Sequence, residues 1–291
     1  MDFVRKVSWR LIALLMLAIS VLAFTPRSII SFPTSAESLK QYSLSLASCL
    51  FIGFFFRRLT WIRHIDTWLH EFGHATVVVL FGGMPKSIRL NQDSSGVTNF
   101  SYSKITPFRD IVISAAGPMA SVFTLLLGSM LVVKGLEVVL LAVVGLFIFL
   151  LLVSTVRTPF GWVVGILIWA SIAFTYSVKL GLIPTLIFPN ALDIYLGCFL
   201  GLASGVSLRS TFQRIRFHSV HGDEGKIALR LHVPEVVVDW LLVILNAAVV
   251  FGVVLYLNVG ATVSVVALSY PELQQKLDEL IQWFKTIPIL N

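Results

Sequence analysis

The chain has 291 residues, of which 57% are hydrophobic and 13% are charged, and its mean hydropathy is +0.89. So much apolar side chain exceeds what one soluble core can bury, which excludes an ordinary soluble domain and indicates a lipid bilayer as the solvent. The net charge of +7 does not favour a nucleic-acid partner, because the basic residues gather in short segments between apolar runs, the pattern that sets membrane orientation.

Apolar runs recur along the chain, and a spanning helix needs roughly 20 residues. They fall at about 9–31, 41–56, 67–83, 107–133, 137–156, 160–178, 180–207 and 235–257. We therefore expect an all-α polytopic membrane protein with about 6–8 apolar helices, some partial or re-entrant. Cys49 and Cys198 lie far apart in two of these runs, so the sequence contains neither a CxxC pair nor a disulfide framework.

The first run follows a basic segment that contains Arg5, Lys6 and Arg10. Secretory signals and first membrane anchors share this layout, and the weak cleavage signal favours an uncleaved anchor. The basic residues predict a cytosolic N-terminus. After two crossings, Arg57 and its basic neighbours return to the cytosol just before residue 67. The later basic loop between Arg209 and Arg230 is also expected to be cytosolic, which requires that the segment 67–83 does not cross fully or that one other run is broken.

Residues 67–83, TWLHEFGHATVVVLFGG, place three ionisable groups inside an apolar run. His70 and His74 are four residues apart, so they share one helix face and can bind one metal ion. Glu71 is rotated away from that pair but can reach a water on the metal, for which a carboxylate serves as general base. Because burying such groups in hydrocarbon is costly, the motif predicts a functional site rather than a wetted interfacial helix.

The segment 84–104 is polar and contains two short alternating stretches. It predicts a short β-hairpin directly after the metal-binding helix, with an ordinary loop as the alternative. Further on, SAAGPMAS at residues 114–121 forms a surface of small residues, against which we expect the metal-binding helix to pack.

A catalytic zinc ion usually has three protein ligands, so a third ligand must come from another segment. The candidates are Asp193, in FPNALDIYLG, and Asp223, in SVHGDEGKIALRLHVP, and each can equally be a helix cap. Asp66, one turn before His70, is expected to be a helix cap, with orientation of an imidazole as the alternative.

The C-terminal stretch SYPELQQKLDELIQWFK begins with a capping box formed by Ser269 and Glu272 and repeats apolar residues at helical spacing. It predicts an amphipathic helix that lies on the bilayer or on the protein. We therefore divide the chain into a membrane-embedded domain, residues 1–268, and a tail, residues 269–291.

The run HEFGHATVVVLFGG, the polar segment after it and SAAGPMAS together resemble the site-2 protease family of intramembrane zinc metalloproteases. The likeness is to the smaller membrane-only branch, which lacks a PDZ domain, and it extends over roughly residues 60–245. In that branch an aspartate precedes an amphipathic stretch, a proline and a Trp-containing apolar helix.

The stretch GDEGKIALRLHVPEVVVDW matches that layout, although Gly222 and Glu224 stand where the branch has Ser and Ala. The resemblance therefore implies Asp223 as the third ligand. Asp193 is the alternative, because PNALDI is similar to the Leu-Asp-Gly motif of the larger family, with Ile194 in place of the glycine.

What the resemblance implies is a Zn²⁺ enzyme that cleaves membrane protein or peptide substrates, in which Glu71 activates a zinc-bound water. The active site is expected to face the cytosol, and the 84–104 hairpin is expected to bind the substrate as an added edge strand. Two non-proteolytic alternatives stay open, a metal transporter or sensor and an inactive protease-like scaffold.

Overall fold

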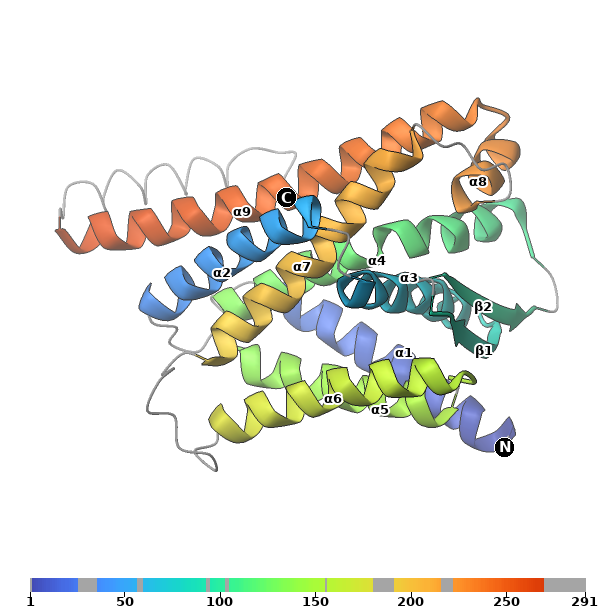
Figure 1. The fold of residues 1–291 in the computed structure, drawn as a ribbon, viewed down its shortest axis with the longest axis horizontal. Coiled ribbons are helices and arrows are strands. Elements are labelled where there is room, and N and C mark those ends of the chain that lie inside the picture. The colour runs from blue at the N-terminus through green and yellow to red at the C-terminus, as the bar shows by residue number, and fades with distance from the viewer. Residues whose placement is uncertain are drawn as a thin grey trace.

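The computed structural model describes residues 2–25, 36–56, 60–92, 95–102, 105–154, 156–179, 191–215 and 222–269. Within these ranges the chain is helical except for one hairpin (Figure 1). The elements are α1 (Asp2–Phe24), α2 (Ala36–Phe55), α3 (Thr60–Leu80), β1 (Met84–Leu90), β2 (Gly96–Ser101), α4 (Pro107–Val133), α5 (Glu137–Ser154), α6 (Pro159–Lys179), α7 (Ala191–Arg214), α8 (Asp223–Leu231) and α9 (Glu235–Ser269).

Five of these helices, namely α1, α4, α6, α7 and α9, are long and apolar enough to cross a membrane, and α5 is a shorter apolar helix. The chain is therefore a multi-pass membrane protein of the all-α class, as its composition predicts. The predicted hairpin after the motif is also confirmed. The predicted C-terminal tail, residues 269–291, lies outside the described part of the chain except for Ser269, to which α9 extends.

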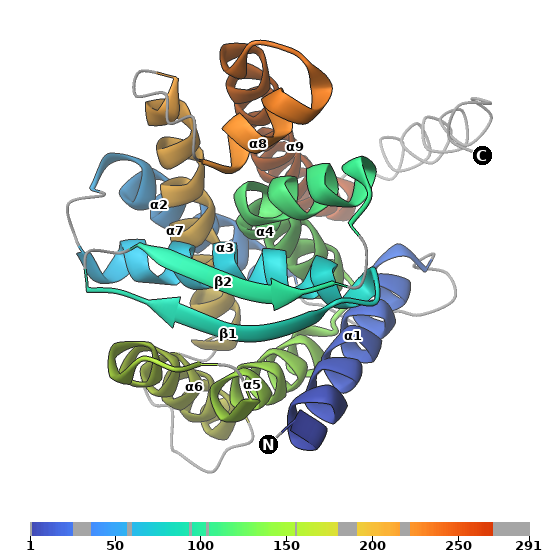
Figure 2. The same cartoon turned by 90° about the vertical axis from the view of Figure 1, so that its right-hand side faces the viewer.

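Helix α3 occupies the middle of the molecule. Figure 2 shows it behind the hairpin, with α4, α8 and α9 on one side and α5 and α6 on the other. The helix begins at Thr60, well before the apolar run that marks it in the sequence. Asp66 consequently lies inside the helix, and the expectation that it caps the N-terminus is wrong.

Strands β1 and β2 pair antiparallel, with Ile88 opposite Thr98, and the register shifts once between Pro85 and Ser87. The outer edge of β1 is covered by the segment that leads into α6: Val156 bridges to Ile88. Among the described residues β2 has no strand partner other than β1. The sheet therefore presents one free edge, and β2 forms it.

Helices α2 and α7 make the most extensive helix contact in the described part of the chain. Three glycines of α7, four residues apart, face the backbone of α2: Gly197, Gly201 and Gly205. A Cβ atom at these glycines would lie 2.6, 2.5 and 2.3 Å from three carbonyl oxygens, also four residues apart: those of Tyr42, Leu46 and Leu50. We call this contact the α2–α7 seam. Because glycine has no Cβ atom, the backbones of α2 and α7 can come into direct contact.

The N-terminal helix is fixed to the rest of the bundle at its C-terminal end. The ammonium group of Lys134, just after α4, donates to the carbonyl oxygens of Leu22, Ala23 and Thr25 at 2.6, 2.5 and 2.5 Å. The last carbonyls of a helix have no partner within the helix, so the lysine satisfies groups that burial would otherwise leave unpaired.

Candidate metal centre

His70 and His74 project from one face of α3, and the distance between their Nε2 atoms is 3.2 Å. The close approach of α4 shapes this region. A Cβ atom at Gly73 would lie 2.4 Å from the carbonyl oxygen of Ala116, so the small-residue surface of α4 packs against α3 as the sequence predicts.

Asp223, the first residue of α8, reaches the two imidazoles from a distant part of the chain. Its Oδ2 atom lies 3.0 Å from Nε2 of His70 and 3.1 Å from Nε2 of His74. Burial raises the pKa of the Asp223 carboxyl, but hydrogen bonds and charge from both histidines outweigh burial and hold that pKa below its usual range. The three side chains thus form a nearly equilateral triangle of ligand atoms.

A backbone carbonyl orients one of the rings. Nδ1 of His74 lies 2.6 Å from the carbonyl oxygen of Ile113 in α4. A carbonyl oxygen only accepts, so Nδ1 carries a hydrogen, and Nε2 is the ring nitrogen that would bind a metal ion after it loses its own proton. Such a partner on the opposite ring nitrogen is typical of histidines that bind metals.

Helix α8 is held by its own contacts. Arg230 forms an ion pair with Asp110 of α4, at 2.7 Å between Nε and Oδ2. A small apolar cluster, separate from the main core, joins α8 to α9 and α4: Ile227, Ala228, Val238 and Leu242 are its buried members. These contacts bring Asp223 to the histidines, because the residue itself begins the helix.

Glu71 lies against the hairpin and is 6% exposed. The Thr98 hydroxyl of β2 is 2.7 Å from its Oε2 atom and 2.9 Å from its backbone carbonyl oxygen. A Cβ atom at Gly96 would lie 2.7 Å from Oε1, so the absence of a side chain there keeps space beside the carboxylate. Strand β2 therefore positions the glutamate.

The donor set fits zinc. Two imidazole nitrogens and one carboxylate oxygen are ligands that zinc accepts, and tetrahedral coordination at about 2.0–2.1 Å places ligand atoms roughly 3.3 Å apart. The three distances here, 3.0–3.2 Å, are close to that value. Gly117 of α4 adds a second observation, because a Cβ atom there would lie 2.3 Å from Nε2 of His74 and 2.7 Å from Nε2 of His70. Glycine thus preserves the space that faces both ligand atoms.

Asp193 is not part of this group. It lies in the first turn of α7, is 1% exposed and accepts a hydrogen bond from Ser38 of α2. Ser210, near the other end of α7, contacts α3 instead, since its hydroxyl lies 3.4 Å from Oδ2 of Asp66.

Three residues at the site escaped the sequence analysis. Thr98 contacts Glu71, Lys226 lies 3.5 Å from Oδ1 of Asp223, and Ser121 donates to Oδ1 of Asp66 at 3.0 Å. Nothing in the sequence indicated the contacts of Thr98 and Lys226, because these contacts depend on the register of the hairpin and on the position of α8 in the fold. Ser121 had a weak signal, since it lies in the small-residue surface that was expected to face α3.

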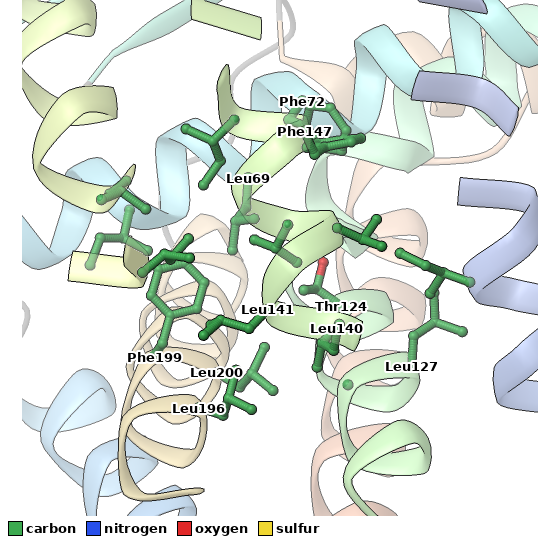
Figure 3. A pocket seen from close by; sticks show the side chains of 18 of the residues that line it. Leu69, Phe72, Thr124, Leu127, Leu140, Leu141, Phe147, Leu196, Phe199 and Leu200 are labelled. Carbon is green, nitrogen blue, oxygen red and sulfur yellow. The ribbon is translucent and has the colours of Figure 1, made fainter. Parts of the chain in front are cut away.

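Away from the candidate ligands, α3 borders an apolar cavity of about 100 Å³. Leu69 and Phe72 of α3, Phe147 of α5 and Leu200 of α7 surround it (Figure 3). The labelled hydroxyl, that of Thr124, already donates to the carbonyl oxygen of Ala120 in its own helix. A cavity lined in this way offers no metal ligand, and the candidate ligands His70 and His74 are not among its lining residues.

A family model described as Peptidase M50B-like matches residues 43–274. The matched segment begins in α2, extends beyond α9 and includes all four residues of the candidate site. Neither a curated protein nor a solved structure matches the chain significantly.

Proposed function

The chain belongs to the Peptidase M50B-like family, and on that premise we propose that it is a zinc-dependent intramembrane peptidase of the site-2 protease type. The observation that carries the proposal is the convergence of His70, His74 and Asp223 beside Glu71. The membrane helices supply the setting, since membrane proteins are the substrates that such a buried site can meet.

We assign His70, His74 and Asp223 as the zinc ligands. Bound there, zinc would lower the pKa of a water molecule toward 7 and polarise the carbonyl of the scissile peptide bond. Asp223 contributes the negative charge that two neutral imidazoles lack. The Ile113 carbonyl keeps His74 in the tautomer that a ligand needs.

Glu71 is the general base in this proposal. Its carboxylate accepts a proton from the attacking water as the water oxygen adds to the carbonyl carbon, and returns it to the amide nitrogen as the C–N bond breaks. Thr98 donates to Oε2, which leaves Oε1 for the proton, on the side where Gly96 keeps space. Thr98 and Gly96 thus distinguish the two carboxylate oxygens of Glu71, because Oε2 accepts the hydrogen bond and Oε1 is the one that takes the proton.

The hairpin is also the proposed substrate-binding element, within residues 84–104. A helical substrate hides its carbonyls in its own hydrogen bonds and must be unwound before cleavage. Strand β2 has the free edge of the sheet and carries Thr98 next to Glu71, so a segment added to that edge would pass the base in extended form. Shortening the hairpin in a folded protein should therefore abolish cleavage.

We further propose that the site faces the cytosol. Helix α8, which supplies Asp223, also carries Lys226 and Arg230. Basic residues in short segments between membrane helices mark the cytosolic side. Labelling of a cysteine placed at Arg230 by a membrane-impermeant maleimide, in sealed inside-out and right-side-out vesicles, tests the orientation.

The decisive experiment compares wild type with Glu71→Gln. The probes are single-span membrane proteins tagged at both ends and co-expressed with each variant, and zinc content of the purified protein is measured by mass spectrometry. We expect Glu71→Gln to keep its zinc and to lose cleavage by about 10²–10⁴-fold, the usual contribution of a general base. Glu37→Gln, an exposed change in the first turn of α2, is the matched control. Cleavage by Glu71→Gln at the wild-type rate would refute the assignment and favour a transporter or scaffold.

A further inference from the structure

The two cysteines of this chain, far apart in the sequence, meet across the α2–α7 seam. Cys49 lies in α2 and Cys198 in α7, and their thiols are hydrogen-bonded to each other. Both are half-buried and neither is bonded in a disulfide. The chain has only two cysteines, and the fold brings them together although nothing in the sequence predicts that contact.

The seam explains why the two thiols are so close. Gly201 lies three residues after Cys198 on the same helix, and a Cβ atom there would be 3.2 Å from Cβ of Cys49. Disulfides need Cβ atoms about 3.5–4.5 Å apart, a separation that ordinary helix packing rarely allows. Here the glycines bring the two backbones into contact, and Cys198 lies one helical turn before the glycine that faces Cys49.

One member of the pair, Cys198, can also be reached from outside. Cys198 lines an open groove of about 670 Å³ between α3, α6 and α7. Most of the other lining residues are apolar, and the exceptions are His64, Ser171 and Tyr195. A small apolar reagent dissolved in the bilayer or in detergent therefore has a route to the sulfur, whereas a charged reagent does not.

We propose that Cys49 and Cys198 are a redox-active pair that forms a reversible disulfide between α2 and α7 when an apolar low-molecular-weight disulfide enters this groove. One thiol loses its proton and attacks the reagent, which releases one reagent thiolate and leaves a mixed disulfide. The second thiol loses its proton, attacks the sulfur of the first cysteine and releases the second thiolate. Two electrons pass to the reagent, and its two thiolates take up the two protons.

The bond would join α2 covalently to the helix that supports the metal-binding helix, because Ser210 of α7 contacts Asp66 of α3. It would close a loop of about 150 residues, which restricts the unfolded chain strongly. The modification rests on packing alone and does not depend on the proposed peptidase activity.

The test uses the full-length protein, purified and reduced in detergent, with excess 4,4′-dithiodipyridine as oxidant. We expect the intact mass to fall by two hydrogen atoms and a peptide that links Cys49 to Cys198 to appear. Dithiothreitol should restore both thiols. Cys49→Ser and Cys198→Ser should each retain one reagent adduct instead. A wild-type protein that carries two adducts, forms dimers or stays unmodified would overturn the proposal.

A melting curve of the oxidised protein provides the second measurement. A disulfide that fits the native seam leaves the melting temperature at or above that of the reduced protein, and Cys198→Ser shows no such dependence on the oxidant. A bond that lowers the melting temperature of the wild type would mean that the thiols meet only in a distorted structure, which contradicts the inference.

Discussion

The metal centre and the α2–α7 seam are built in opposite ways. At the metal centre, polar side chains from α3, α8 and β2 converge through individual hydrogen bonds of 2.7–3.1 Å. At the seam, the contact depends on side chains that are absent, namely those of Gly197, Gly201 and Gly205. A change at the first region should therefore alter chemistry in a folded protein, whereas a change at the second should alter stability and leave the ligands intact.

The largest effect is expected from removal of Asp223, the proposed third ligand. Asp223→Ala takes away the only carboxylate in contact with both imidazoles among the described residues, and we expect zinc affinity to fall by more than about 100-fold, beyond the loss seen when a supporting residue is removed. Asp193→Ala should keep the wild-type zinc content and lower stability, because Ser38 loses its acceptor. Titration with a zinc indicator measures the zinc affinity of both variants. Zinc loss in Asp193→Ala alone would reverse the assignment.

The two aspartates show what the sequence reveals about the centre and what it does not. His70, Glu71 and His74 follow from spacing, because residues four apart share a face of any helix. The third partner comes from another helix, and no local pattern tells which acid reaches the histidines. The resemblance favoured Asp223, yet both candidates begin helices and both fit the description of a cap.

The start of α3 illustrates a different limit. The apolar run begins near Thr67, but the helix continues back to Thr60 through a segment that contains the polar residues Arg63, His64 and Asp66. Hydropathy records which part of a helix meets lipid or core, whereas backbone hydrogen bonds determine where the helix begins. Asp66 was therefore expected to be a cap, although its carboxylate in fact accepts hydrogen bonds from Ser121 and Ser210.

Part of the α2–α7 seam could be predicted from the sequence. The stretch GCFLGLASG, residues 197–205, contains three glycines at four-residue spacing, which indicates a helix face that another backbone can approach closely. The partner of that face cannot be read from the spacing. The contact between Cys49 and Cys198 was for that reason invisible in the sequence.

The second-largest effect is expected from a methyl group added at the α2–α7 seam. Gly201→Ala places a Cβ atom 2.5 Å from the Leu46 carbonyl oxygen, where only backbone can give way. We expect a loss of about 1–3 kcal/mol in the free energy of unfolding, the usual cost of overpacking, with zinc affinity unchanged. Gly252→Ala in α9 is the matched control, since no atom lies within 4 Å of its new Cβ. Equal melting temperatures for the two variants would show that the backbones are not in contact.

The smallest expected effect comes from the hydroxyl that joins the hairpin to the base. Thr98→Val keeps the shape of the side chain and removes the donor to Oε2 of Glu71, a hydrogen bond worth about 1.5 kcal/mol. If the hydroxyl orients the carboxylate, kcat should fall about tenfold while KM and zinc content stay constant, and Thr98→Ser should restore the rate. A rise in KM alone would mean that Thr98 serves substrate binding on β2 instead. The comparison of valine with serine isolates one proton donor, so it separates the chemistry of the metal centre from the packing that supports it.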